Sequence, residues 1–172
     1  MKFSVNNFDK HEDSRGIFYE IPNIMNHQIF QSSISISKKD VLRGLHYQHS
    51  PEMGKQINIL SGAILECIVD IRPQSDSFGK HKKMFCDPKR NSSIYIPPGF
   101  AHGFLTLENN TTIMYHQTAK YNKLGEGTIS PFDTTLQINW GIEKGQCIMS
   151  ERDMKSESFL QYKEKEIMWS VK

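Results

Sequence analysis

The chain has 172 residues with a formal net charge of +2 at pH 7, and 37% of its residues are hydrophobic. This length predicts one domain over residues 1–172, since a domain commonly takes about 100–200 residues and can then fold without a disulfide or metal. The near-neutral charge argues against nucleic-acid binding by bulk electrostatics, and three widely spaced cysteines (Cys67, Cys86 and Cys147) argue against a disulfide framework or a zinc site.

The N-terminal stretch, residues 1–16, lacks the unbroken apolar run of about 7–15 residues that a signal peptide needs. No apolar run in the sequence approaches the roughly 20 residues of a membrane span. An odd number of cysteines without a pairing pattern favours reduced thiols. We therefore expect a cytoplasmic protein with no membrane partner.

Polar and apolar residues alternate with period two along much of the chain, which predicts short strands. The first alternating segment, residues 32–47, places Ile34 and Ile36 on one face. Residues 55–72 hold two alternating runs separated by Ser61-Gly62, a hairpin signal. The basic segment 79–90 has the Gly, Pro and interleaved lysines of a solvated hairpin.

Strands are also predicted within residues 92–99, 109–121 and 137–140, and one helical segment is predicted from Ser150 to Glu166. Many short strands joined by polar turns are typical of an antiparallel sandwich or barrel. The prediction is an all-β fold with a short C-terminal helical segment.

Several polar side chains interrupt the apolar strands, and we expect them to converge at one end of such a barrel. Arg43 and His46 lie near the end of one predicted strand, Lys55 begins the next, and His102 follows a Pro-Pro-Gly turn on a third. Inward and outward side chains alternate in a small barrel, whose interior can hold one small ligand. Each residue alone also fits a structural role, but buried polar groups without partners cost free energy.

One hypothesis from these motifs is a metal-binding cupin. The P-x-G-x-x-H segment over residues 97–102 resembles the second cupin motif, and G-x-H at 44–46 resembles the first. However, Gln48 stands where the metal-binding family has a second histidine, and Lys55 falls where a glutamate ligand is expected. An ammonium group would repel a metal cation. We expect a cupin-like protein without a metal, and a metal-dependent oxygenase remains the alternative.

Six segments carry a more specific resemblance. In chain order they are DSRGIFYE (13–20), VLRGLHYQ (41–48), GK (54–55), VDIRPQSDSFGK (69–80), IPPGFAHGF (96–104) and SERD (150–153). Together they resemble the nucleotide-sugar epimerase family represented by dTDP-4-dehydrorhamnose 3,5-epimerase, over residues 12–155. The resemblance implies a cupin-type jelly-roll barrel, a homodimer, no cofactor and no metal. It also implies inversion of C3 and/or C5 in a nucleoside-diphosphate 4-keto-6-deoxy sugar.

The resemblance also implies roles for individual residues. His46 is the base that removes a proton next to the ketone, and Asp153 orients its imidazole. Lys55 stabilises the negative charge that develops on the C4 oxygen, and Tyr115 donates a proton from the opposite face. The matching substrate-binding residues are Arg15, Phe18 and Glu20 from the partner subunit, and Gln31, Ser33, Arg43, His102, Tyr121 and Glu126 from the same subunit. Among these, Tyr121 is implied to stack on the base.

Other interpretations of these residues remain open. Asp153 completes an S-x-x-D capping box with Ser150, Tyr115 and Tyr121 can be ordinary strand aromatics, and Lys55 can be a surface lysine beside a turn. Arg72 in the DIR segment is given no catalytic role. The chain also departs from the family's usual residues at Ser33, His116, Phe132 and Gly141. These departures leave the proton-transfer residues intact but leave open the base, the sugar and whether one or both centres are inverted. A catalytically silent sugar-nucleotide binding module is a separate alternative.

Overall fold

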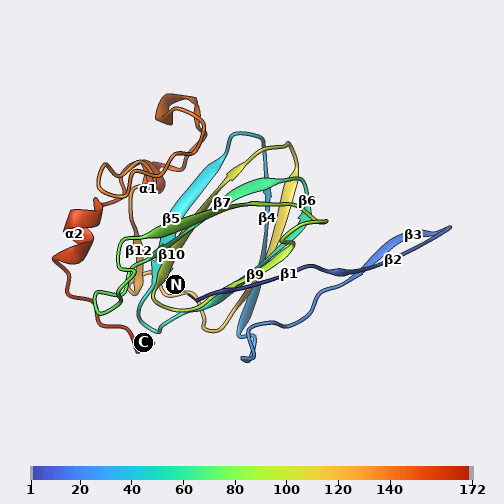
Figure 1. Cartoon of the computed structure of the whole chain (residues 1–172), viewed down its shortest axis with the longest axis horizontal. Helices are drawn as coiled ribbons and strands as arrows, with labels where there is room; N and C mark the ends of the chain where they lie inside the picture. Colours follow the sequence, from blue (N-terminus) through green and yellow to red (C-terminus); the bar gives the residue numbers. More distant parts are fainter. Residues whose placement is uncertain (1, 171–172) are drawn as a thin grey trace.

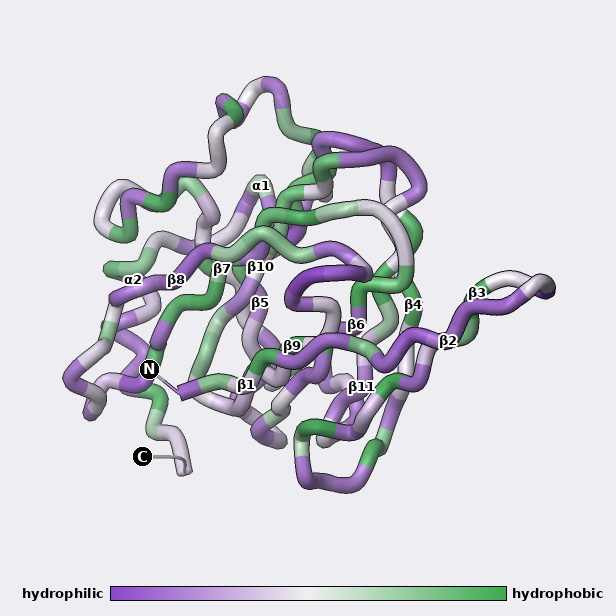
Figure 2. The backbone as a smooth tube through the Cα atoms, turned by 45° about the vertical axis from the view of Figure 1, so that its right-hand side comes forward, coloured by the Kyte–Doolittle hydropathy of each residue, from purple (hydrophilic) through white to green (hydrophobic). Residues whose placement is uncertain are grey.

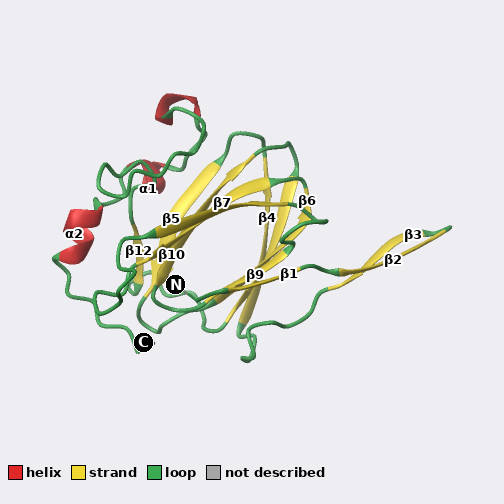
Figure 3. Cartoon of the chain, viewed as in Figure 1, coloured by secondary structure: helices red, strands yellow, loops and turns green. Residues whose placement is uncertain are grey.

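A computed structural model describes residues 2–170, so Met1, Val171 and Lys172 of the predicted domain lie outside the described residues. Two antiparallel five-stranded sheets face each other, as Figures 1 and 3 show. The first sheet has the order β1 (Ser4–Asn6), β9 (Ser93–Ile96), β6 (Lys55–Ser61), β11 (Thr111–Gln117) and β4 (Gln31–Ser37). The second has the order β12 (Glu126–Thr128), β5 (Leu42–Gln48), β10 (Phe100–Thr106), β7 (Ile64–Asp70) and β8 (His81–Cys86). This arrangement confirms the predicted all-β jelly-roll fold.

The second sheet is covered on both faces. One apolar cluster fills the space between the two sheets, with isoleucines from β6, β7 and β9 and with Phe100 and Phe104 from β10. A second cluster packs the outer face of β5 and β7 against C-terminal side chains that include Phe159, Tyr162 and Trp169. A strand buried on both faces needs an almost continuous apolar run. This requirement explains the segment ILECIV in β7, in which Glu66 is the one charged residue.

In β4 the apolar side chains face solvent and the polar ones face the interior, which is the reverse of an ordinary half-buried strand. Ile34 and Ile36 share a face, as predicted, but that face points outward, and the two side chains are 61% and 67% exposed. The intervening side chains point inward, where Ser35 bonds to Tyr115 and Ser37 to Arg43. The interior beside β4 is therefore polar.

One predicted hairpin is wrong in its pairing. Strands β6 and β7 are continuous across Ser61-Gly62 but belong to different sheets, because β6 pairs with β9 and β11 while β7 pairs with β8 and β10. Gly62 has φ +75°, and a Cβ there would lie 2.3 Å from Thr111 Oγ1, so this corner requires glycine. The basic segment 79–90 forms an edge strand, β8, and ends in a tight turn that an antiparallel bridge between Asp87 and Arg90 closes, so the expected turn is present.

Two further predictions near the C-terminus are corrected. Residues 137–140 form no strand, because Ile138 and Trp140 are buried by packing while the backbone between them has no strand partner. The predicted single helix is two short ones, α1 (Glu151–Met154) and α2 (Phe159–Lys163). Between them, Glu157 N–H bonds to the carbonyl of Thr128, which interrupts the helix. No described helix has the length and apolar character that crossing a membrane requires.

A two-stranded arm, β2 (Asp9–Asp13) and β3 (Gly16–Glu20), projects away from the two sheets (Figures 1 and 2). Its strands pair only with each other. Almost every residue of the arm is exposed, including Phe18 at 63%. A two-stranded hairpin has little stability by itself in water, so an arm with exposed apolar side chains is a feature that needs a partner surface.

Candidate active site

A cavity of about 270 Å³ opens between the two sheets, beside the inward face of β4. Six residues singled out from the sequence line it: Ser33, Arg43, His46, Lys55, His102 and Tyr115. They come from β4, β5, β6, β10 and β11, so the convergence expected of a barrel interior is observed. Sequence reasoning missed Ser35, Phe104 and Gln117, which also line the cavity. Alternation along β4 and β11 could have placed Ser35 and Gln117 on the same face as Ser33 and Tyr115.

Strand pairing places the two histidines of the cavity side by side. His46 on β5 and His102 on β10 are direct partners in the antiparallel ladder. The two strands approach closely where Gly44 faces Gly103, and a Cβ on Gly44 would lie 2.6 Å from the Gly103 Cα. Glycine is required at this crossing because a side chain would force β5 and β10 apart.

His46 forms a short hydrogen bond with the first turn of α1. Its Nε2 lies 2.7 Å from Oδ1 of Asp153, which is almost fully buried. Burial by itself would raise the pKa of Asp153, but the hydrogen bond and charge of His46, aided by Ser150 and the Gly44 backbone, lower it. A carboxylate at this position accepts the Nε2 proton of His46, so Nδ1 is the ring nitrogen that is left to act as a base when the imidazole is neutral.

The capping interpretation of Asp153 also holds in part. The Ser150 hydroxyl accepts a hydrogen bond from the backbone N–H of Asp153 at 3.1 Å. The Asp153 carboxylate contacts His46. The backbone of Asp153 thus serves the cap while its side chain serves the cavity.

His102 binds a different carboxyl group through its other ring nitrogen. Its Nδ1 lies 3.0 Å from Oε1 of Glu66 on β7, and both side chains are buried. Burial raises the pKa of Glu66 well above its ordinary value, although the charge of Lys55 opposes this. Burial, with the charges of Lys55 and His46, lowers the pKa of His102 well below its ordinary value. Sequence reasoning missed Glu66, although a glutamate inside an apolar strand is itself a signal.

Lys55 and Arg43 supply positive charge to the cavity. Burial lowers the pKa of Lys55, while Glu126 and Glu66 act in the opposite direction. The side chain of Lys55 lines the cavity, so the interpretation of Lys55 as a surface lysine beside a turn is wrong. The Arg43 guanidinium donates to the hydroxyl of Ser37 at 3.2 Å.

Tyr115 enters the cavity from the sheet opposite to His46. Its hydroxyl lies 3.0 Å from the hydroxyl of Ser35. Burial raises the pKa of Tyr115 to about 12, against smaller lowering effects of Ser35 and Arg43. The phenol therefore keeps its proton near neutral pH and can act as a donor.

A second hollow, of about 310 Å³, contains Tyr121 and Glu126. Arg152 lies across it, with a nitrogen 2.8 Å from a Glu126 carboxylate oxygen, and Lys123 adds a second positive charge. Gln31 accepts a hydrogen bond from the backbone N–H of Tyr121 at 3.2 Å. The three predicted residues of this region are thus adjacent. Arg152 and Lys123 were not singled out, although Arg152 lies in the same SERD segment as Asp153.

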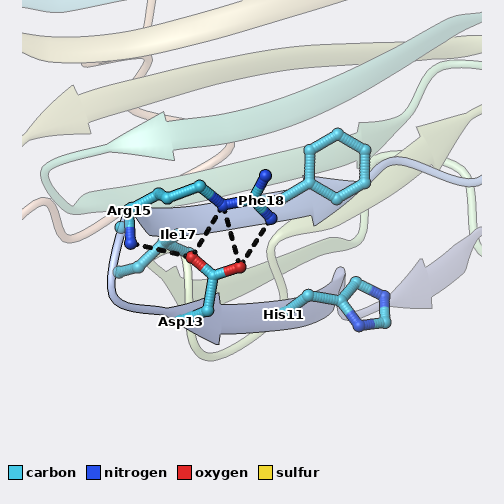
Figure 4. Close-up of a pocket in the computed structure, with 6 residues that line it drawn as sticks. His11, Asp13, Arg15, Ile17 and Phe18 are labelled. Atoms are coloured by element: carbon cyan, nitrogen blue, oxygen red, sulfur yellow. Dashed lines mark hydrogen bonds and ion pairs between the residues drawn. The ribbon is translucent and has the colours of Figure 1, made fainter.

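The remaining predicted residues, Arg15, Phe18 and Glu20, lie on the projecting arm and not at the cavity of their own chain. Figure 4 shows Arg15 turned toward Asp13, with a shortest nitrogen–oxygen distance of 2.6 Å. A hollow beside the arm is lined by His11, Asp13 and residues 15–18. Within one chain, the structure therefore does not bring these three residues to the site.

Arg72 has a structural environment away from the cavity. It forms a bidentate contact with Asp70, with distances of 2.6 and 2.9 Å, and it lies 4.6 Å from the centroid of the Phe100 ring. Among residues 2–170, no group of three or more His, Cys, Asp or Glu side chains is arranged to hold a metal ion.

Comparison with known proteins identifies one family. The family model described as dTDP-4-dehydrorhamnose 3,5-epimerase matches residues 3–161. A dTDP-4-dehydrorhamnose 3,5-epimerase of Mycobacterium tuberculosis is 37% identical over 159 residues, covering 87% of this chain and 79% of the relative.

Solved structures of similar proteins share the jelly-roll fold. An epimerase from Legionella pneumophila in complex with dTDP-4-keto-L-rhamnose has a TM-score of 0.87 at 28% identity, covering 99% of this chain and 100% of the other. A 3'-monoepimerase from Streptomyces bikiniensis in complex with dTDP-quinovose has a TM-score of 0.86 at 26% identity, covering 96% and 88%. Both two-centre and single-centre enzymes are thus similar to this chain.

Proposed function

The chain belongs to the dTDP-4-dehydrorhamnose 3,5-epimerase family and is an isomerase of deoxysugar biosynthesis, and we propose that it inverts both C3 and C5 of a dTDP-linked 4-keto-6-deoxy sugar. One observation carries the mechanism: His46 on β5 and Tyr115 on β11 line one cavity from opposing sheets. Inversion needs a base on one face of the sugar ring and an acid on the other.

In the first half-reaction, His46 removes the proton from the carbon next to the ketone. The C–H bond breaks, the proton goes to Nδ1 of His46, and the electron pair moves to the C4 oxygen as an enolate. Asp153 stabilises the imidazolium through its 2.7 Å hydrogen bond. Lys55 stabilises the oxyanion electrostatically.

In the second half-reaction, the phenol of Tyr115 gives its proton to the same carbon from the opposite face. The C–H bond forms again with inverted configuration, the ketone is restored, and solvent reprotonates the phenolate while His46 releases its proton. The same groups then act on the second carbon. No oxidant, reductant, metal or cofactor enters this sequence of steps.

The nucleotide is proposed to lie across the second hollow. Tyr121 stacks on the base, a contact worth about 1–3 kcal/mol. Gln31, Ser33 and Glu126 contact the nucleoside, and Arg43 and His102 hold the diphosphate and the ring. The positive charge of Lys123 and Arg152 in the hollow supports the binding of an anionic nucleotide there.

We propose that the protein works in the cytoplasm as a homodimer in which the arm of one protomer completes the site of its partner. Arg15, Phe18 and Glu20 lie on the arm, which is mostly exposed and pairs with no other strand among residues 2–170. The exposed apolar face of β4, with Ile34 and Ile36, supports an interface between copies. Three free cysteines, two of them buried, are compatible with a reducing compartment.

The second candidate is an epimerase that inverts only one centre, which the similarity to the Streptomyces bikiniensis 3'-monoepimerase favours. A silent binding module would not need His46, Lys55, Tyr115 and Asp153 together. The test is to incubate a panel of nucleotide-linked 4-keto-6-deoxy sugars with the enzyme in deuterated water and to follow them by NMR. Deuterium at both C3 and C5 with inversion of both is expected. Deuterium and inversion at one carbon alone would establish the second candidate, and no exchange in any sugar would contradict both.

A further inference from the structure

Glu66 lies in an environment that does not favour a charge. On β7 it shares its inward face with Ile64 and Ile68, which belong to the apolar cluster between the sheets. Its direct partners on the neighbouring strands are Phe104 on β10 and Met84 on β8. The side chain is fully buried. An isolated carboxylate in such a place pays a large desolvation cost unless it is paired or protonated.

The hydrogen bonds of Glu66 are too few for a carboxylate ion. Oε1 contacts Nδ1 of His102 at 3.0 Å, and Oε2 has no hydrogen-bond partner among the described residues. A carboxylate ion is only an acceptor, so a buried one would need a hydrogen-bond donor at each oxygen. A protonated carboxyl needs only one strong contact, in which its O–H donates to the imidazole nitrogen. The raised pKa of Glu66 and the lowered pKa of His102 agree with two neutral partners.

We propose that Glu66 is a positioning residue that carries a proton and donates it to Nδ1 of His102, so that His102 presents Nε2–H to the cavity. The catalytic effect of this proton rests on the proposed function. In that reaction, Nε2–H of His102 donates a hydrogen bond to the C4 oxygen, where the enolate charge develops. His102 then assists Lys55 as a neutral donor, and no proton is transferred from it during the reaction.

The two histidines of the cavity therefore present different groups: His46 presents a basic nitrogen and His102 presents an N–H donor. Asp153 is ionised and binds Nε2 of His46, which leaves a basic Nδ1. Glu66 is protonated and binds Nδ1 of His102, which leaves a donor at Nε2. A charged His102 is disfavoured because its side chain is buried and because the positive charge of Lys55 lies near it. The ionised carboxyl group thus makes one imidazole a base, and the protonated carboxyl group makes the other imidazole a hydrogen-bond donor.

The direct test is the tautomer of His102 in the ligand-free wild-type protein, read by ¹⁵N NMR of the imidazole nitrogens at neutral pH. The assignment is made by comparison with a His102→Gln sample. A protonated Nε2 and an unprotonated Nδ1 are expected. A proton on Nδ1 would show that Glu66 is an ionised acceptor and would overturn the proposal. This measurement needs no substrate, so it is independent of whether the proposed function is correct.

Two substitutions supply the kinetic test. Glu66→Met keeps the approximate volume but removes the donor, and kcat should fall by up to about 10²-fold, the effect of a lost oxyanion donor. In Glu66→Gln the amide N–H₂ replaces the O–H donor, so this variant should recover most of that loss and keep the Nε2–H tautomer. Equal losses in both variants, with nucleotide binding intact, would mean that a carboxylate ion is needed and would contradict the proposal. If no 4-keto sugar exchanges deuterium with the wild type, the proposed function fails, while the tautomer result still decides the state of Glu66.

Discussion

His46 and His102 are direct cross-strand partners, and each binds a buried carboxyl group through a different ring nitrogen. The contact to Asp153 uses Nε2 of His46, whereas the contact to Glu66 uses Nδ1 of His102. The two imidazoles therefore turn different atoms toward the same cavity. Most of the expected effects of substitution follow from this pairing.

Replacing the base should stop the chemistry and leave binding in place. His46→Ala should bind nucleotide normally but lose solvent exchange at C3 and C5 by at least about 10²–10⁴-fold, the usual contribution of a general base. Deuterium incorporation by NMR and nucleotide titration by calorimetry measure the two effects. His49→Ala is the matched control, because His49 follows the same strand but does not line the cavity. Exchange near the wild-type rate in His46→Ala would exclude it as the base.

The two roles of the Asp153 position can be separated by substitution. Asp153→Asn keeps the backbone N–H that Ser150 caps but removes the ionised acceptor, so kcat should fall by up to about 10⁴-fold as His46 loses its tautomer. Ser150→Ala should instead cost about 1 kcal/mol of unfolding free energy with little change in kcat. Steady-state kinetics and urea unfolding of both variants test this. A purely structural Asp153 would give two variants with the same profile.

Removing the phenol of Tyr115 should uncouple exchange from inversion. Tyr115→Phe keeps the ring, so His46 should still remove a proton and return deuterium to the original face, while inversion slows by about 10²-fold or more. NMR in deuterated water distinguishes retained from inverted product. Unchanged inversion would indicate another acid on that face. Because the pKa of Tyr115 is raised to about 12, the wild-type enzyme should not lose this donor below about pH 10.

The proposed sharing of the site between two protomers predicts complementation between two inactive variants. His46→Ala lacks the base but has an intact arm, and Arg15→Ala has the base but a defective arm. Mixed dimers should contain one complete site, so an equimolar mixture after subunit exchange should regain about a quarter of wild-type activity. Each variant alone should stay inactive under the same treatment. Full activity of Arg15→Ala alone, or no recovery after verified exchange, would contradict the shared site.

Acid should weaken the fold through Asp70. Burial would raise the pKa of Asp70, but hydrogen bonds from Arg72, Ser77 and Ser75 outweigh it and lower the pKa to about 2. A lowered folded-state pKa gives stability that is present above the unfolded value of 3.8 and is lost as pH falls toward 2. Asp70→Asn should therefore cost about 2 kcal/mol at pH 7, and its difference from wild type should shrink toward pH 2. Urea unfolding across this pH range measures it, with exposed Asp76→Asn as the control.

The alternation of polar and apolar residues predicted the extent of some strands well. Strands β9 and β11 fall within the predicted ranges, and six of the residues that line the cavity were predicted as site residues. Alternation could not tell which face of β4 is inward, because Ile34 and Ile36 point outward and a serine row faces the cavity. Only the position of the cavity, which depends on both sheets, decides this.

Local sequence patterns do not predict which strands pair or which distant residues contact each other. The Ser61-Gly62 turn has the composition of a hairpin, but whether two strands stay in one sheet depends on their other neighbours. Glu66 was missed because its partner His102 lies 36 residues away. The role of Asp153 was left open between a cap and a catalytic partner because both use the same SERD segment, and only the direction of its side chain distinguishes them.

The absence of side chains where Gly44 crosses Gly103 has a consequence for how such enzymes diverge. The separation of the two imidazoles is set by main chain on both strands, so no substitution at the crossing can adjust it without pushing β5 and β10 apart. Variation that selects a new sugar or a new stereochemical outcome must then accumulate elsewhere, on the cavity wall formed by β4 and β11, in the segment that carries Tyr121, and on the arm. The backbone of β5 and β10 therefore fixes the spacing of the two imidazoles, and we expect a change of substrate to come from side chains away from this crossing.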